Sequence, residues 1–233
     1  MDTIIQYLFM IPAALLSLSV HECCHGYAAY RLGDPTARNF GRLSLNPLKH
    51  FDLYGMLCMV FFRVGWAKPV PINPRNFKNP RNGMAITAAA GPLSNLLLAF
   101  IAAIFIKLIV LLANTVFPYA FGDAILLLGK YALTADASYL AYFFYYLILF
   151  FELFHFANLS LFVFNMLPIP PFDGSRIFFI FLPPRLYFKI MKYEHIIQIV
   201  IIVAIALGAL TGVLSTVTGW VSNGIFRILS FIP

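Results

Sequence analysis

The sequence predicts a mainly α-helical membrane protein, a polytopic helix bundle of about four to six transmembrane segments. Of its 233 residues, 61% are apolar or aromatic and only 11% are charged, whereas soluble domains carry about 25% charged residues. With a mean hydropathy of +0.86, the chain would expose a large apolar surface in water. Apolar runs long enough to cross a bilayer lie at residues 3–29, 84–112, 139–167 and 196–217. The length fits a single integral-membrane domain over residues 1–233.

The region between the first two apolar runs, residues 30–82, differs in composition from the rest of the chain. It contains nine basic residues against Asp34 and Asp52, together with many turn-forming Gly, Asn and Pro residues. Within it, residues 53–62 are apolar but too few to span a membrane as a helix. We therefore expect a small re-entrant or interfacial β element after the first span, its backbone polar groups satisfied by protein or a water-filled cavity.

The distribution of basic residues predicts the side of the membrane on which each loop lies. Residues 30–82 and 168–195 are rich in Arg and Lys, whereas residues 113–138 hold only Lys130 against two aspartates. The positive-inside rule then puts the first two regions in the cytoplasm and the third outside, with residues 117–133 along the interface. The N-terminus is expected outside, four spans are the simplest count, and the expected location is the cell (inner) membrane.

The net charge of +7 does not indicate nucleic-acid binding, because the basic residues are spread over loops beside apolar runs. No cleavable signal peptide is expected, since the first apolar run lacks a basic segment before it and carries ionisable residues. Three cysteines do not form a disulfide framework.

The first apolar run carries the pattern His-Glu-x-x-His, formed by His21, Glu22 and His25. Residues four apart lie on one face of a helix, so both imidazoles can bind a single Zn²⁺ ion. Glu22 sits beside that pair and can take a proton from water at the metal. Each ionisable residue inside a spanning helix costs about 2.5–3.5 kcal/mol, and a bound cation compensates for this cost. The alternative interpretation is a polar helix end at the cytoplasmic interface.

A catalytic zinc site needs a third protein ligand and one open position. Its candidates are the remaining histidines and several carboxylates: His50, His155, His195, Asp52, Asp123, Glu152 and Asp173. The predicted orientation favours Asp173, which follows the cytoplasmic end of the third long apolar run, and disfavours Asp123 on the other side. Asp173 also follows prolines that break the helix near membrane depth. The residues alone rank Asp173 ahead of His50 and Glu152, which stay open as alternatives.

Three motifs occur in a recognisable order along the chain. His-Glu-Cys-Cys-His ends the first apolar run, Gly-Pro-Leu-Ser-Asn opens the second at residues 91–95, and Asn-x-x-Pro-x-x-x-x-Asp-Gly follows at residues 165–174. From about residue 17 to residue 177, the chain resembles the site-2 protease family of intramembrane zinc metalloproteases (peptidase family M50). More narrowly, it resembles the short bacterial members that lack PDZ or CBS domains.

The resemblance implies specific roles for the motif residues. His21, His25 and Asp173 would bind one Zn²⁺ per chain, and Glu22 would be the catalytic base. It further implies that Asn95 lies near the active site and helps to hold the substrate or the developing oxyanion. Asn165 would be a polar group that supports the ligands or faces the substrate.

The expected function is hydrolysis of peptide bonds in or next to transmembrane segments of membrane-protein substrates, that is, regulated intramembrane proteolysis. Its partners would be a transmembrane substrate and the lipid bilayer, with no nucleic acid. Two alternatives from other classes are a membrane metal transporter and a non-catalytic scaffold that keeps zinc for stability. The sequence fixes neither the substrate nor the oligomeric state.

Other polar residues of the apolar runs have simpler interpretations. Glu152 and His155 lie on one face of a helix and are expected to form a satisfied intramembrane pair, or to line a substrate path. A di-iron bundle needs more carboxylates than the three glutamates of this chain. Lys107 is expected to snorkel or to meet a polar partner, and His50 to lie on a loop surface.

Overall fold

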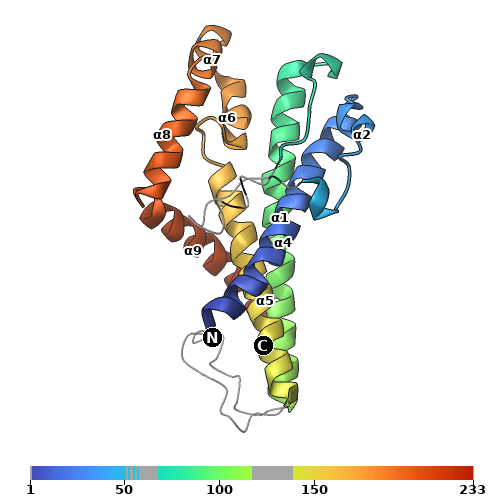
Figure 1. Cartoon of the computed structure of the whole chain (residues 1–233), viewed down its shortest axis with the longest axis vertical. Coiled ribbons are helices and arrows are strands. Elements are labelled where there is room, and N and C mark those ends of the chain that lie inside the picture. Colours follow the sequence, from blue (N-terminus) through green and yellow to red (C-terminus); the bar gives the residue numbers. More distant parts are fainter. Residues whose placement is uncertain are drawn as a thin grey trace.

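The computed structural model describes residues 2–50, 52, 55, 57, 68–116 and 139–232. This part of the chain is mainly helical and contains no strand (Figure 1). The predicted helical class is therefore confirmed, whereas the predicted β element finds no support in the described ranges. Most of residues 53–62, and all of residues 117–133, lie outside them.

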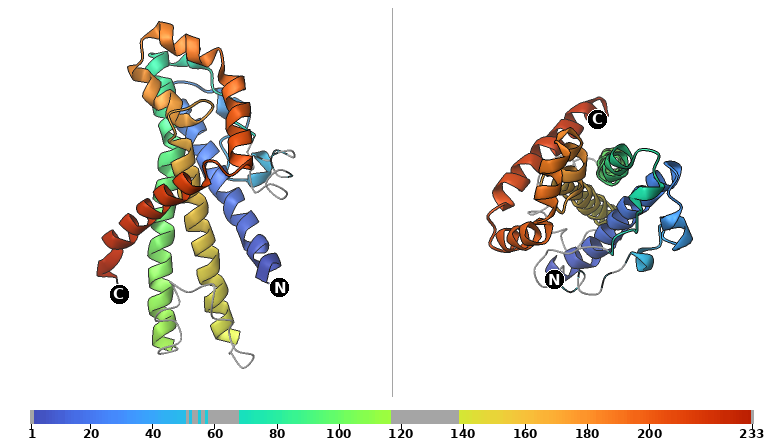
Figure 2. Two further views of the ribbon diagram at one scale, coloured as in Figure 1. Left: turned by 90° about the vertical axis from the view of Figure 1, so that its left-hand side faces the viewer. Right: turned by 90° about the horizontal axis from the view of Figure 1, so that it is seen from above.

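Three helices are long and apolar enough to cross a membrane: α1 (Asp2–Arg31), α4 (Pro80–Val116) and α5 (Tyr139–Asn165). They pack side by side into an elongated bundle in which α4 contacts both α5 and α1 (Figures 1 and 2). The 37 residues of α4 correspond to about 55 Å, more than the roughly 30 Å of a bilayer's hydrocarbon layer. The described residues thus hold three candidate spans, fewer than the sequence led us to expect.

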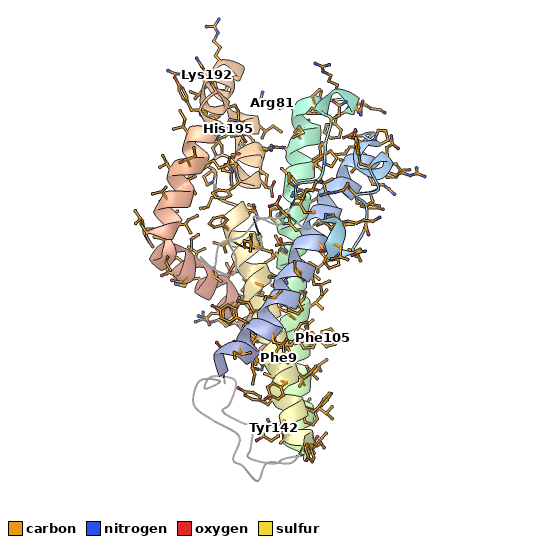
Figure 3. All side chains as sticks on the ribbon, viewed as in Figure 1. Phe9, Arg81, Phe105, Tyr142, Lys192 and His195 are labelled. Atoms are coloured by element: carbon orange, nitrogen blue, oxygen red, sulfur yellow. The ribbon has the colours of Figure 1, made fainter. Side chains whose placement is uncertain are left out.

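Small side chains and stacked aromatic rings join these helices. Alanines on the buried side of α4, among them Ala99 and Ala103, let the neighbouring helices approach closely. Phe9 of α1 stacks on an α5 tyrosine with ring centres 5.7 Å apart. Phe105 of α4 stacks on Phe151 of α5 at 5.0 Å. Phe9 and Phe105 both lie partway along the bundle in Figure 3, between Arg81 at one end and Tyr142 near the other.

The fourth apolar run is not one continuous span, contrary to the prediction. It forms α8 (Glu194–Ala206) and α9 (Thr211–Ile228), with a turn between them. Gly208 in this turn has a φ of 76°, a left-handed conformation that glycine adopts without steric cost. The Ala209 N–H bonds to the Ala204 carbonyl at 2.9 Å, the long bond of a Schellman helix end. An apolar run therefore bends where hydropathy alone suggested a straight helix.

The helix α9 crosses the bundle obliquely and is attached to it by polar contacts (Figure 2). His155 Nε2 of α5 lies 3.0 Å from Ser222 Oγ of α9. Beyond the terminal turn η5 (Leu229–Phe231), the Lys107 ammonium donates to the Ile232 carbonyl at 2.8 Å. Lys107 thus has the polar partner that was expected for it.

Short elements gather around the upper part of the bundle in Figure 1. From the region before α4 they are α2 (Thr36–Asn39), η1 (Pro47–Lys49) and η2 (Pro74–Asn76). From the region after α5 they are α6 (Asp173–Phe178), η4 (Phe179–Phe181) and α7 (Pro184–Met191). Arg81 and Lys192 lie at this end of the bundle, and Tyr142 lies near the other (Figure 3). The two basic regions therefore share one end of the molecule.

A buried aspartate organises the segment that follows α1. Asp34 is fully buried, and its carboxylate accepts hydrogen bonds from the Thr36 backbone and hydroxyl, from the Asn73 N–H (2.7 Å) and from the Asn76 amide (2.7 Å). Burial alone would raise the pKa of Asp34, but these hydrogen bonds outweigh it and hold the pKa below its ordinary value of 3.8. Asp34 therefore ties the end of α1 to residues 73–76, which precede α4.

Replacing Asp34 with Asn should lower the free energy of unfolding of the purified protein by about 2 kcal/mol or more, because an amide NH₂ would face buried donors. Since the folded pKa is depressed, the contribution of Asp34 is complete above about pH 5 and is lost as the pH falls below the ordinary value. Thermal unfolding in detergent between pH 3 and pH 7 measures both effects. Asp52→Asn is the matched control, because Asp52 is only partly buried and, among the described residues, accepts a hydrogen bond from the Gly55 N–H. Equal losses in the two variants would contradict the role of Asp34.

Candidate functional site

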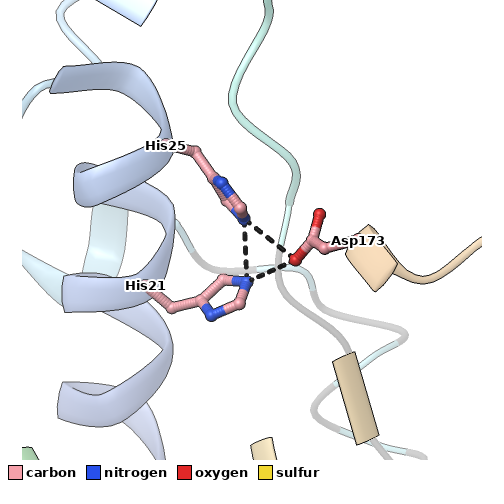
Figure 4. A group of neighbouring side chains, drawn as sticks. All are labelled: His21, His25 and Asp173. Atoms are coloured by element: carbon pink, nitrogen blue, oxygen red, sulfur yellow. Dashed lines mark hydrogen bonds and ion pairs between the residues drawn. The ribbon is translucent and has the colours of Figure 1, made fainter. Parts of the chain in front are cut away.

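The helix α1 presents two imidazoles one turn apart, on the side that faces α6 (Figure 4). His21 and His25 are both buried, and their Nε2 atoms lie 2.9 Å apart with the rings nearly perpendicular, at 89°. The four-residue spacing thus directs both nitrogens to one point, as a shared ligand requires.

A carboxylate reaches the same point from a different part of the chain. The helix α5 ends at Asn165, the chain turns, and α6 begins at Asp173. Asp173 Oδ2 lies 3.2 Å from the Nε2 atoms of both His21 and His25. The next residue is Gly174, where a Cβ would lie only 2.5 Å from the carbonyl carbon of Met166, so the turn closes this tightly only with glycine.

The outer nitrogen of each imidazole is held by an acceptor on α4. His25 Nδ1 lies 2.7 Å from the Thr87 carbonyl, and His21 Nδ1 lies 2.6 Å from Asn95 Oδ1. Both partners are oxygens that only accept, so each Nδ1 carries the hydrogen. Each Nε2 therefore turns a lone pair toward the other imidazole and toward Asp173.

This arrangement fits a metal cation. Two lone pairs and an anionic oxygen repel one another at 2.9–3.2 Å unless positive charge lies between them. Tetrahedral zinc, with bonds of 2.0–2.2 Å to nitrogen and oxygen, sets its ligand atoms roughly 3.3 Å apart, close to the separations seen here. Two imidazoles and one carboxylate are also a donor set that such a metal uses in catalysis, with a fourth position left open.

The charge state of Asp173 suits this role. Burial alone would raise the pKa of the Asp173 carboxyl. Without a metal, the Nε2 atoms of His21 and His25 can each take up a proton, and the hydrogen bonds and positive charge of the protonated imidazoles then hold the Asp173 pKa well below the ordinary range. The carboxylate is therefore ionised at neutral pH, as a metal ligand has to be.

Glu22 lies beside the imidazole pair at the edge of a pocket of about 220 Å³. Its Oε2 accepts a hydrogen bond of 2.9 Å from the Val70 N–H, which fixes the orientation of the carboxylate. The pocket is lined by residues of α1, of α4, of the segment before α4, of the end of α5 and of the region around α6: His21, Glu22, His25, Pro69, Val70, Ile72, Met84, Thr87, Ala88, Asn165, Pro171, Asp173 and Arg176.

The segment that carries Val70 is anchored on both sides. Before it, the Arg42 guanidinium donates to the Lys68 carbonyl at 2.5 Å, and the Lys68 N–H donates to the His50 carbonyl at 2.9 Å. After it, the Asn73 N–H is held by Asp34. The donor that orients Glu22 is therefore fixed from outside the helix bundle.

Close approach of α4 to the imidazoles depends on Gly91. A Cβ at this position would lie 2.7 Å from His21 Cε1 and nearer still to the ring of His25, and real Cβ atoms essentially never come that close. The glycine of the Gly-Pro-Leu-Ser-Asn motif thus leaves room for both rings between α1 and α4.

Gly91→Ala should displace both imidazoles and weaken metal binding by about tenfold or more, the effect expected when the support of a ligand is disturbed. Competition with a chelator of known affinity measures this. Gly219→Ala in α9 is the control, because a Cβ there meets nothing within 4 Å. Unchanged metal affinity in Gly91→Ala would show that α4 does not set the positions of the rings.

The two asparagines implied by the family resemblance lie at or beside the site in different ways. Asn165 lines the pocket, and its amide donates to the Leu161 carbonyl at 3.0 Å. Asn95 is fully buried, binds His21 through Oδ1, and donates through Nδ2 to Asn158 and to the Ser17 carbonyl. In this structure Asn95 therefore supports an imidazole and does not face the pocket, where a substrate or oxyanion contact was expected.

The other ligand candidates lie elsewhere or outside the described residues. The ring nitrogens of His155 meet the Ala99 carbonyl and Ser222, so the predicted pair with Glu152 is not formed. His50 is buried and its Nε2 meets the Ser44 carbonyl, which corrects its expected place on a loop surface. His195 is exposed on α8.

Sequence reasoning missed several residues that support the site. Thr87 acts through its backbone carbonyl and Val70 through its backbone N–H, which no side-chain pattern reveals. Asn158 was also missed, although a lone amide within a long apolar run is a signal for a buried polar contact.

Comparison with known proteins identifies the family. A family model described as "Peptidase family M50" matches residues 9–209, a range that includes all three motifs. The chain belongs to peptidase family M50. It is similar to a protein of Bacillus subtilis (strain 168) named "Putative zinc metalloprotease YwhC", at 37% identity over 186 residues, which cover 80% of this chain and 74% of that protein. No solved structure gives a significant match.

Family M50 places the chain among the metallopeptidases, and the resemblance to site-2 proteases drawn from the motifs is confirmed. The His21, His25 and Asp173 cluster is the group of potential metal ligands that the structure brings together in the described ranges.

Proposed function

We propose that this M50 protein is an intramembrane zinc endopeptidase that hydrolyses peptide bonds in or next to transmembrane segments of membrane-protein substrates. The observation that carries the proposal is the position of Glu22. The Glu22 carboxylate lines the same pocket as the three convergent side chains that could bind a metal. Glu22 itself belongs to α1, a helix long and apolar enough to span a membrane. A base beside a metal site is what hydrolysis needs, and what metal storage or structural stabilisation does not need.

Zinc is the metal proposed for the site, as the name of the Bacillus relative suggests, and one ion per chain would be held by His21, His25 and Asp173. When bound there, zinc would act as a Lewis acid that lowers the pKa of water and polarises a carbonyl group. The hydrogen bonds at Nδ1 of both imidazoles keep the two Nε2 atoms available for it.

Glu22 is the proposed general base. Its carboxylate accepts a proton from the attacking water and later donates it to the leaving amine. The Val70 N–H holds one of its oxygens, so the carboxylate needs no reorientation before it accepts the proton.

The position of the histidine pair within a helix long and apolar enough to cross a membrane supports a substrate that lies in the membrane. His21 precedes the end of α1 at Arg31 by ten residues, or about 15 Å along the helix. A transmembrane helix that presents a peptide bond to this site has its carbonyls bonded within the helix, so it has to unwind locally before attack. The lipid bilayer and the unwound segment are therefore the proposed partners.

Replacing Glu22 with Gln should reduce cleavage of a membrane-embedded substrate by about 10²–10⁴-fold, because the amide cannot accept the proton. Zinc content should stay at one ion per chain, since Glu22 is not one of the three ligands. Purified protein in proteoliposomes, assayed by product mass and by metal analysis, measures both quantities. His21→Ala is the matched variant that should lose activity and zinc together, and a chelator should abolish wild-type cleavage.

The same assay tests the two competing functions. A metal transporter would show zinc flux across the vesicle membrane with little dependence on Glu22. A scaffold stabilised by zinc would keep its function in the Glu22→Gln variant. Cleavage that survives this substitution would refute the protease.

We further propose that the protein is a multi-pass protein of the cell's inner membrane, with the active site toward the cytoplasm. The basic regions share one end of the bundle (Figure 3). The site lies toward that end, because His21 and His25 are in the second half of α1 and Asp173 follows the end of α5. The positive-inside rule puts this end in the cytoplasm. Trypsin should cut near Arg185, Lys189 and Lys192, which are exposed around α7, in sealed inside-out vesicles. It should not cut there in intact spheroplasts. The opposite pattern would reverse the orientation.

A further inference from the structure

Three buried polar side chains meet deep in the bundle, one from each spanning helix. Ser17 of α1, Asn95 of α4 and Asn158 of α5 are each 0% exposed. Asn95 Nδ2 donates to Asn158 Oδ1 at 2.8 Å, and Asn158 Nδ2 donates to Ser17 Oγ at 2.8 Å. A fully satisfied network of this kind in an apolar interior specifies one arrangement, because any broken bond leaves an unpaired polar group in a low dielectric.

The direction of these hydrogen bonds is fixed by backbone carbonyls. Asn158 Nδ2 also donates to the Phe154 carbonyl at 2.8 Å, and Asn95 Nδ2 donates to the Ser17 carbonyl at 3.3 Å. A carbonyl accepts and never donates, so the Nδ2 of Asn158 has to face Phe154. Its Oδ1 then faces Asn95, and Asn95 has to offer a hydrogen to it.

The same direction of hydrogen bonding continues to His21, one of the three candidate metal ligands. With both Nδ2 hydrogens of Asn95 engaged, its Oδ1 is the atom that faces His21 Nδ1, at 2.6 Å. His21 then carries its hydrogen on Nδ1 and keeps the Nε2 lone pair for a metal. The backbone of α5 thus reaches the ligand through two asparagine amides.

We propose that Asn158 is a positioning residue that, through Asn95, holds His21 in the tautomer able to bind a metal at Nε2. The inference rests on the proposed function only in taking Nε2 as the ligand atom. Without Asn158, Asn95 Nδ2 loses its 2.8 Å bond and keeps only the longer, 3.3 Å bond to the Ser17 carbonyl. Rotation of the amide by half a turn would give up that remaining bond and direct Nδ2 at His21. His21 would then accept at Nδ1 and carry its hydrogen on Nε2, the atom that faces His25 and Asp173.

The test compares Asn158→Leu with His155→Leu. Both residues lie on α5 within one turn of each other and are almost completely buried, and each bonds to a backbone carbonyl and a serine. The bonds of His155 go to Ala99 and to α9, away from the metal cluster. The two variants therefore remove comparable buried polar contacts, and only one of them touches the path to His21.

Two readouts separate positioning from simple destabilisation. Competition with a chelator gives zinc affinity, and Asn158→Leu should weaken it by about 10–100-fold, the range for residues that orient a ligand. His155→Leu should change it less than about twofold at a similar loss of thermal stability. Nitrogen-15 NMR of histidine-labelled, metal-free protein in lipid at a pH where the imidazoles are neutral gives the tautomer of His21 directly.

The expected NMR result is hydrogen on Nδ1 in the wild type and in His155→Leu, with a shift toward Nε2 in Asn158→Leu. Equal zinc losses in the two variants, or an unchanged tautomer in Asn158→Leu, would overturn the proposal. So would hydrogen on Nε2 in the wild type, a measurement that holds even if Asn158→Leu does not fold. Failure of the proposed function is distinct, because it would appear as wild-type protein that binds no zinc or as cleavage that survives Glu22→Gln.

Discussion

The approach of two imidazole nitrogens and one carboxylate oxygen to within 3.2 Å is the constraint on which the rest of the structure depends. Such groups repel one another without a cation, so either the fold holds them together against this repulsion or a bound cation offsets it. The long helices position the groups. The helix α1 carries two of the groups, and α4 supplies the acceptors that turn both rings inward.

Two glycines make that geometry accessible, for different reasons. Gly91 removes the side chain that would otherwise separate α4 from the imidazoles, so the rings pack against bare backbone. Gly174 allows the chain after α5 to fold back and deliver Asp173 to the same point. Glycine is required at both positions for lack of space alone, because a methyl group at either one would overlap its neighbours. The motifs around these glycines therefore describe helix packing as much as chemistry.

The sequence predicted the helical class, the histidine pair and the approach of Asp173, because each depends on local periodicity or on charge distribution. It failed where tertiary structure decides. Hydropathy does not register a left-handed glycine, so the break at Gly208 was missed. Asn95 was expected near the active site and does lie beside His21, but no pattern shows that its amide hydrogens are used by Asn158 and Ser17, and its role toward a substrate stays a prediction. His50 was expected on the surface, although its ring meets the Ser44 carbonyl.

The anchored segment around Val70 has a thermodynamic consequence for the candidate site. Its N–H orients Glu22 within the membrane domain, while its flanks are fastened by Arg42 on one side and Asp34 on the other. Any ligand that prefers a shifted conformation of this segment also changes the free energy of holding Glu22 in place. By thermodynamic reciprocity, a peptide that binds next to Glu22 changes the affinity of the segment around Val70 for that ligand by the same factor. The segment around Val70 and the Glu22 carboxylate are thus energetically linked through a single backbone hydrogen bond.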